Sequence, residues 1–194
     1  MRLLSQLSQL SLGLTLASIV SAFAAESSHP ERPTGVSLDS LVHLTSQYGA
    51  PLTRADLAGR PFIVLFGYTH CPEVCPTVLF DLSMHLDKLG LDGNRLGVMF
   101  VTVDPERDTV PVLRDYLSSF DPRITGLTGS KENVAAVANA FGAKIEQRLT
   151  GDGTYSLNHS YMIFMVDKYG LLAKVVGYDA PKTLARYSLR LLAQ

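Results

Sequence analysis

The sequence predicts an α/β domain in which a central mixed sheet is flanked by helices. Residues 62–66 are a continuous apolar run, which is typical of a strand buried on both faces of a sheet, and the run over 96–103 predicts a second buried strand. A segment with apolar residues at helical spacing follows each run, so strands and helices alternate along the chain. The chain has 194 residues, 46% of them hydrophobic and 18% charged, which suits one globular domain.

Two elements surround the first apolar run. Before it, residues 36–44 and 51–57 flank the sequence Gln-Tyr-Gly-Ala and predict a short antiparallel hairpin at the N-terminal end of the domain. After it, a helix is expected because apolar residues recur at helical spacing. These apolar residues are Val78, Leu82, Leu86 and Leu89. Gly90 is expected to end this helix.

The rest of the chain continues the alternation and then changes to strands. The expected segments are a helix over 110–120, a strand over 124–127, a helix from Ser130 to Phe141, a hairpin of 143–149 and 155–158 around a Gly-Asp-Gly turn, strands over 160–166 and 171–176, and a final helix from Pro181. A cysteine pair stands where the first buried strand meets its helix. This order is that of a thioredoxin-like fold with a late hairpin insertion.

The first 24 residues have the pattern of a secretory signal peptide. A leucine-rich apolar stretch ends before Ala22 and Ala24, the small residues that a signal peptidase needs. We expect cleavage before Ala25, a flexible linker over 25–35 and the folded domain over 36–194. The alternative is an uncleaved anchor, because the stretch approaches the roughly 17–25 residues that span a bilayer. Either way the domain is expected outside the cytoplasm.

The charge of the chain bears on its partners. Its formal net charge is −1, and no block of like charge stands out. Proteins that bind nucleic acid carry basic stripes that neutralise phosphates, so nucleic acid is not an expected partner. Partners are expected to be recognised by shape and local chemistry instead.

The two cysteines, Cys71 and Cys75, are expected to perform chemistry rather than to staple the fold. A disulfide between residues this close closes only a small loop and adds little stability. In the first turn of a helix the two sulfurs lie on one side, where free N–H groups and the helix dipole favour thiolates. Pro72 and Pro76 stiffen the loop.

His159 is the expected third ligand of a metal ion held by these thiols. It stands just before the strand over 160–166, whose start lies against the cysteine loop in thioredoxin folds. Two thiolates suit soft Cu(I), and an added imidazole also accommodates Cu(II). A closed zinc site is disfavoured because it uses four ligands and only three are visible.

The other histidines are weaker candidates. His29 falls in the linker and His43 in the early hairpin, while His70 adjoins the first cysteine in a turn where neighbouring side chains diverge. His85 is expected on the exposed face of its helix, paired with Asp81 four residues earlier.

The polar run over 102–108 emerges at the same sheet end as the cysteines. We expect a capped turn with an internal ion pair between arginine and a carboxylate. The alternative is that Asp104 supports the metal site through a hydrogen bond to one of its ligands. Four methionines in apolar patterns are expected in the core rather than at the metal: Met84, Met99, Met162 and Met165.

Several segments together closely resemble the Sco/SenC family across about residues 36–177. They are the sequence FGYTHCPEVCP over 66–76, the run over 102–108, Gly-Leu-Thr-Gly over 126–129, and Asn158-His159-Ser160. The resemblance implies a thioredoxin-like fold and one copper ion, Cu(I) or Cu(II), bound by Cys71, Cys75 and His159. Glu73 stands where the family more usually has Asp, a change that keeps the charge.

The resemblance also implies a function. It implies that the protein is a metallochaperone rather than an enzyme, and that it delivers copper in the periplasm to the dinuclear site of cytochrome c oxidase. The implied partners are the copper-site subunit of the oxidase and, beyond it, another copper chaperone or a thiol reductant. Membrane contact is expected only through the oxidase or an uncleaved N-terminus. Many family members keep an anchor, whereas this chain has a cleavage pattern.

The alternative function is a thiol-disulfide oxidoreductase that reduces the cysteines of the oxidase copper site. Cys71 and Cys75 would then be the redox-active pair. Because thiol exchange needs no imidazole, His159 discriminates between the two functions. A redox or copper sensor is a third hypothesis that uses the same residues.

Overall fold

The structure, a computed structural model, describes residues 38–151 and 154–194. These residues belong to the compact unit Glu31–Gln194. The expected signal peptide over 1–24 and linker over 25–35 lie outside the described residues. In the described part of the chain, no helix is both long enough and apolar enough to cross a membrane.

The helices and strands follow one another in an α/β pattern. They are η1 (Leu38–His43), β1 (Thr45–Ser46), α1 (Arg54–Leu57), β2 (Phe62–Gly67), α2 (Val74–Leu89), η2 (Gly90–Arg95), β3 (Gly97–Thr102), α3 (Val110–Leu117), β4 (Ile124–Thr128), α4 (Lys131–Phe141), β5 (Ile145–Leu149), β6 (Tyr155–His159), β7 (Met162–Val166), β8 (Leu172–Gly177) and α5 (Pro181–Leu192). Each strand and helix expected after residue 60 is present, with ends that shift by a few residues.

The central sheet is mixed, as the sequence predicts. Its strand order is β1-β4-β3-β2-β7-β8. Strands β2, β3 and β4 run parallel, whereas β7 is antiparallel to β2 and β8 is antiparallel to β7. Every residue of β2 and β3 is buried, which explains why both strands are apolar apart from Thr102 at the end of β3.

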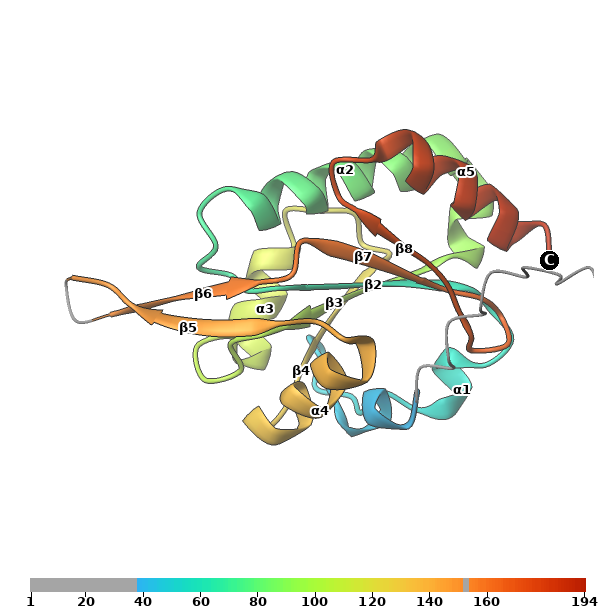
Figure 1. The fold of residues 1–194 in the computed structure, drawn as a ribbon. Coiled ribbons are helices and arrows are strands. Elements are labelled where there is room, and N and C mark those ends of the chain that lie inside the picture. The colour runs from blue at the N-terminus through green and yellow to red at the C-terminus, as the bar shows by residue number, and fades with distance from the viewer. Residues whose placement is uncertain (1–37, 152–153) are drawn as a thin grey trace, which may run out of the picture. The chain divides into compact units, whose positions relative to one another are not determined.

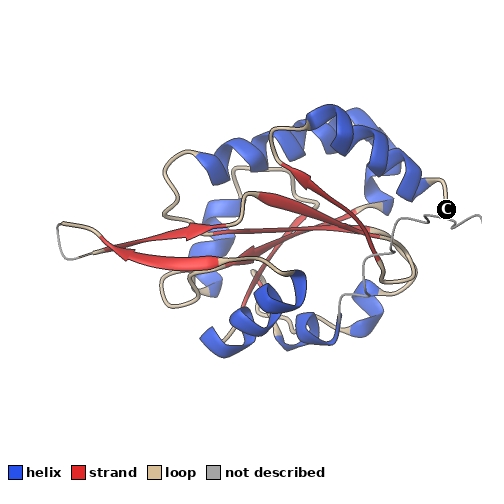
Figure 2. Cartoon of the chain, viewed as in Figure 1, coloured by secondary structure: helices blue, strands red, loops and turns tan. Residues whose placement is uncertain are grey.

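Helices cover both faces of this sheet (Figures 1 and 2). Helices α2 and α5 lie over one face, and α4 lies over the other. On the α4 face, three phenylalanine rings meet edge to face: Phe66 of β2, Phe141 of α4 and Phe164 of β7, with centroids 5.4–5.9 Å apart. This packing fixes β2, and therefore the loop that follows it, in the middle of the molecule.

The expected N-terminal hairpin is wrong in its element types. The first arm is the 3₁₀-helix η1, and the second contains α1, which Thr53 caps through reciprocal hydrogen bonds with Asp56. Only an isolated antiparallel bridge between Thr45 and Pro51 remains of the hairpin, and β1 pairs with β4 instead. The segment is too short to show a clear period. Leu38 and Leu41 are three residues apart, which places them on one side of a 3₁₀ turn, whereas in a strand they would point to opposite faces.

The late hairpin insertion is confirmed. Strands β5 and β6 form a separate antiparallel pair, with a register that runs from Ile145 opposite His159 to Leu149 opposite Tyr155. The pair projects away from the central sheet (Figure 1). Its second strand ends three residues before β7, so the insertion leads directly back to the centre of the fold.

Candidate metal centre

The two cysteines lie at the junction between β2 and α2. Cys71 is in the connecting loop and Cys75 is the second residue of α2, as expected. The Cys75 backbone N–H donates to the Cys71 sulfur at 3.4 Å, so the sulfur takes up one of the free N–H groups at the helix start. Both side chains are buried, and both thiols are free.

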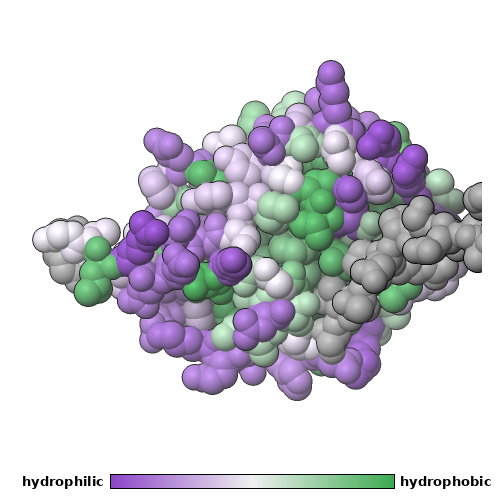
Figure 3. Space-filling model, viewed as in Figure 1, coloured by the Kyte–Doolittle hydropathy of each residue, from purple (hydrophilic) through white to green (hydrophobic). Residues whose placement is uncertain are grey.

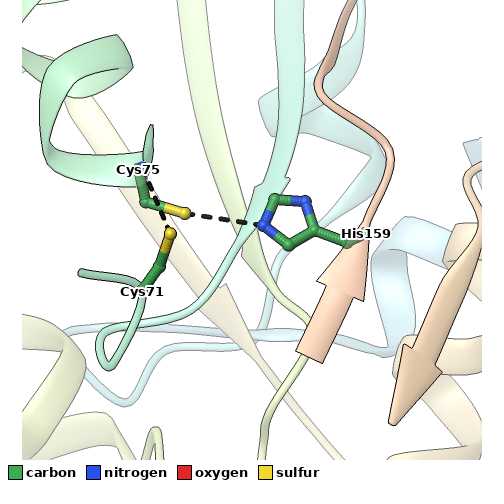
Figure 4. Close-up of side chains that lie close together, drawn as sticks. All are labelled: Cys71, Cys75 and His159. Atoms are coloured by element: carbon green, nitrogen blue, oxygen red, sulfur yellow. Dashed lines mark hydrogen bonds between the residues drawn. The ribbon is translucent and has the colours of Figure 1, made fainter. Parts of the chain in front are cut away.

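His159 approaches the sulfurs from the end of β6. Its Nε2 lies 3.6 Å from the Cys75 sulfur (Figure 4). Its Nδ1 lies 3.3 Å from the Ser160 carbonyl oxygen. The rings of Tyr68 and Tyr161 contact the imidazole edge to face on two sides. The imidazole is buried, and the contacts orient one nitrogen toward the thiols.

These three side chains form a set of donors that fits one soft metal ion. Donor atoms of Cys71, Cys75 and His159 all lie within 4.8 Å of one another. Hydrogen bonds from Cys75 hold the pKa of the Cys71 thiol far below its ordinary value, against the opposing effect of burial. The hydrogen bond between the two cysteine side chains, together with burial, raises the pKa of the Cys75 thiol. These opposite shifts favour a thiolate at Cys71 over one at Cys75, and a bound cation can displace the remaining proton.

The site opens to solvent on the Cys71 side. A cleft of about 320 Å³ lies there between the cysteine loop and β6. It is lined by Tyr68, Cys71, Pro72, Glu73, Val74, Ser156, Leu157, Asn158 and Tyr161. Glu73 is the only charged side chain in this lining, so one acidic group stands in an otherwise uncharged, partly apolar surface beside Cys71.

The remaining histidines are placed away from this cluster. His43 and His70 are exposed, and His70 contacts the Thr69 hydroxyl at 3.1 Å. His85 is half-buried and lies 3.0 Å from the hydroxyl of Ser188 in α5, with a pKa lowered by burial. The expected pair with Asp81 is therefore wrong, because α5 packs beside the helix face that was expected to be exposed. His29 lies outside the described residues.

The methionines divide into two groups. Met99 and Met165 are buried in the core, as expected. Met84 and Met162 are 41% and 37% exposed, so their expected place in the core is wrong. Met84 lies on the exposed side of α2, and Met162 is the exposed first residue of β7.

The polar run after β3 forms the expected capped turn with an internal ion pair. Asp104 is buried, accepts a hydrogen bond from the Arg107 Nε, and accepts another from the Tyr155 hydroxyl at 2.8 Å. These partners are not candidate ligands. A supporting role of Asp104 would therefore act through Arg107 and Tyr155 rather than on a ligand directly.

Sequence reasoning missed Asp108, which anchors the cysteine loop. Its fully buried carboxylate accepts hydrogen bonds from the Thr69 N–H at 3.0 Å, from the Thr69 hydroxyl at 2.6 Å and from the Thr102 hydroxyl at 2.6 Å. The loop that carries Cys71 is thus tied to the end of β3. A usable signal was present, because this carboxylate and both threonines stand in segments that leave the same sheet edge.

The fold and this donor set define a class: a thioredoxin-like domain with a candidate Cys-Cys-His metal site at its first strand-to-helix junction. The family model described as SCO1/SenC matches residues 34–193. The chain belongs to the SCO1/SenC family.

Individual relatives agree with this assignment. Over 130 residues, 66% of this chain, it is 35% identical to both Protein SCO1 homolog 1, mitochondrial, of Arabidopsis thaliana and Protein SenC of Rhodobacter capsulatus. The matches span 39% and 59% of the length of these two relatives. The structure of Bradyrhizobium japonicum ScoI with copper bound is 38% identical, with a TM-score of 0.71 over 76% of this chain and 95% of that one.

Proposed function

We propose that this protein binds one copper ion through Cys71, Cys75 and His159 and delivers it to the dinuclear copper site of cytochrome c oxidase. The observation that carries the proposal is the buried set of two sulfurs and one imidazole nitrogen within 4.8 Å. Soft sulfur donors and an imidazole suit copper in both of its common oxidation states. The related ScoI is described with copper bound, which supports the same cargo here.

The cleft beside Cys71 supports delivery as well as binding. Metal transfer between proteins requires that an incoming ligand reaches the ion while the donor still holds it. Of the three donors, Cys71 lines the open cleft, whereas Cys75 and His159 do not. A thiolate of the partner can therefore replace the Cys71 sulfur first, and copper changes ligands without a change of oxidation state.

The proposed setting and partners follow the family. We propose that the domain is exported to the periplasm, and that its partner is the copper-site subunit of the oxidase. Another copper chaperone would load it, or a thiol reductant would keep its cysteines reduced. In this role the protein is an assembly factor rather than an enzyme.

One observation favours a second candidate function, thiol-disulfide exchange with the oxidase cysteines. Both thiols are free, and the pKa of Cys71 is lowered by its hydrogen bonds from Cys75. A thiolate at an open cleft is the attacking group that such exchange requires.

The first test concerns the ligands. Cys71→Ser and Cys75→Ser should each abolish tight, equimolar copper binding and the thiolate-to-Cu(II) absorption, because one thiolate alone holds a soft cation poorly. The measurement is metal analysis and competition titration of the purified protein. Retention of tight, equimolar copper by either variant would contradict the proposed site.

The second test separates the two functions. His159→Ala should weaken Cu(II) binding strongly and Cu(I) binding less, and should leave the Cys71–Cys75 redox couple largely intact. If copper delivery is the function, this variant fails to restore oxidase activity at limiting copper in a strain that lacks the gene. Full restoration by a folded His159→Ala protein would establish thiol exchange instead.

A further inference from the structure

The hairpin that supplies His159 has little of its own to hold it in place. Strands β5 and β6 form a two-stranded sheet outside the six-stranded sheet, and isolated hairpins are marginally stable in water. In these two strands only Leu157 and His159 are buried. Figure 3 shows a mainly hydrophilic surface over the hairpin. Few side chains of the hairpin therefore pack in the core, so polar contacts are needed beside the ring contacts of Tyr68 and Tyr161 to hold the imidazole in place.

A cluster of polar contacts holds Tyr155, the first residue of β6, in place. The Arg107 guanidinium stacks over the Tyr155 ring with 3.9 Å to its centroid, and its Nη1 donates to the Tyr155 carbonyl oxygen at 3.2 Å. Arg107 Nε and the Tyr155 hydroxyl both donate to the Asp104 carboxylate. We call Asp104, Arg107 and Tyr155 the clamp, because each of the three contacts the other two.

The clamp is continuous with the anchor of the cysteine loop. Arg107 is followed directly by Asp108, whose carboxylate holds the N–H and hydroxyl of Thr69. The Arg107 guanidinium also lies 5.9 Å from the ring centroid of Tyr68, whose hydroxyl accepts the Leu157 N–H at 3.4 Å. One turn thus holds both the loop with the thiols and the strand with the imidazole.

The guanidinium is not arranged for stability alone. Arg107 Nη2 is buried and lacks a hydrogen-bond partner within the described part of the chain. A buried unpaired donor lowers stability, so the guanidinium does not satisfy all of its own hydrogen bonds in this position. Its position is set instead by its contacts with Asp104 and Tyr155, which tie the hairpin to the turn after β3.

We infer that Arg107 is a positioning residue that holds His159 at the metal through the clamp and so determines how tightly the site binds Cu(II) relative to Cu(I). This inference rests on the proposed copper-binding function. Cu(I) is satisfied by two thiolates, whereas Cu(II) gains from the nitrogen donor. A hairpin released from the clamp samples positions in which the imidazole is out of reach. The apparent Cu(II) affinity therefore falls in proportion to the fraction of molecules in which the imidazole can reach the metal.

The experiment compares Arg107→Met with wild type in the full purified protein, using Cu(II) and Cu(I) ions against competing chelators. We expect Cu(II) affinity to fall on the order of ten-fold, since about two favourable contacts are lost, and Cu(I) affinity to change much less. In metal-free protein, amide hydrogen exchange over β5 and β6 should become faster. In a His159→Ala background, Arg107→Met should cause no further loss of Cu(II) affinity.

Arg54→Met is the matched control, because it makes the same change of residue type in α1. Arg54 pairs with Asp39 at 2.6 Å on the surface, and its ion pair does not involve the hairpin. This variant should leave both affinities and the exchange rates unchanged. Tyr155→Phe is a milder variant that keeps the ring under the guanidinium, so a smaller but equally selective Cu(II) loss is expected even if Arg107→Met does not fold.

Three outcomes would overturn the inference: unchanged Cu(II) affinity in the folded variants, equal loss of both copper ions, or additive losses in the His159→Ala background. Failure of the proposed function is distinguishable from these. If wild type binds no copper, amide hydrogen exchange in the metal-free protein still tests whether Arg107 holds the hairpin. Exchange rates over β5 and β6 that do not change in Arg107→Met would by themselves contradict the role of the clamp.

Discussion

Single buried side chains decide where the donors of this site stand. The carboxylate of Asp108 receives hydrogen bonds from two threonines, one in the cysteine loop and one at the end of β3. Hydrogen bonds to a buried charged group are among the stronger contributions to stability. Asp108 therefore links the position of the thiols to the central sheet.

Replacing this carboxylate should loosen the loop. We expect Asp108→Asn to lower the free energy of unfolding by about 1–3 kcal/mol, because an amide cannot accept all three hydrogen bonds. Urea unfolding of the metal-free protein measures it. Asp115→Asn, at an exposed position of α3, should change stability by less than about 0.5 kcal/mol. Equal effects of the two substitutions would contradict an anchoring role.

At the scale of elements, the close approach of α2 to β2 brings Cys75 into the core. Gly67 ends β2, and a Cβ atom built on it would lie 2.5 Å from Phe100 Cε2 and 2.9 Å from the Cys75 sulfur. Glycine is therefore the only residue that lets the helix start this near the sheet.

A methyl group at this point should disturb both the core and the site. We expect Gly67→Ala to lower the free energy of unfolding by about 1–3 kcal/mol through overpacking, and to weaken copper binding because the Cys75 sulfur must move. Gly151→Ala is the control, since a Cβ there would meet no atom within 4 Å. Thermal or urea unfolding and a copper titration measure the two effects. Wild-type values for both in Gly67→Ala would show that the helix can shift freely.

The turn between α3 and β4 makes the stability of the fold depend on pH. Hydrogen bonds from Arg123 lower the pKa of Asp121 against the effect of burial. The folded pKa lies below the unfolded one, so this contribution is present above roughly pH 4 and is lost as pH falls through the folded pKa. Asp121→Asn should therefore cost about 1–2 kcal/mol at pH 7, and the difference from wild type should narrow toward pH 3.

Urea unfolding of both proteins at the two pH values tests this expectation. Asp92→Asn is the control, because its pair with Arg95 is exposed and should contribute little at either pH. A difference between Asp121→Asn and wild type that stays constant from pH 7 to pH 3 would contradict the assignment.

At the scale of the whole molecule, the site joins two parts of the fold that are far apart in sequence. Cys75 belongs to the first strand-to-helix junction, and His159 comes 84 residues later from an inserted hairpin. A metal ion held by all three donors therefore connects the insertion to the central sheet.

The proposed setting outside the cytoplasm depends on the first residues. The exported protein is expected to begin at Ala25, since Ala22 and Ala24 meet the small-residue requirement for cleavage. Intact mass of the protein recovered from the periplasm measures this. Recovery of a full-length, membrane-embedded species would show an uncleaved anchor instead.

The sequence by itself determined the features that depend on local spacing. Buried strands show as apolar runs, helices as a 3.6-residue period, and the cysteine pair as a spacing of four at a helix start. The late histidine was found because the fold plan places its strand beside the cysteine loop. Short leucine-rich segments such as η1 were misjudged, since so few residues do not distinguish the two periods.

Only the tertiary structure decided which polar groups meet. Thr69 and Asp108 are 39 residues apart, Asp104 and Tyr155 are 51 apart, and His85 and Ser188 are 103 apart. Such pairs leave no periodic pattern, because each depends on how elements pack and not on spacing within one element. The sequence therefore named the candidate donors, whereas packing decided that Asp108 anchors the cysteine loop and that Asp104 turns toward the hairpin.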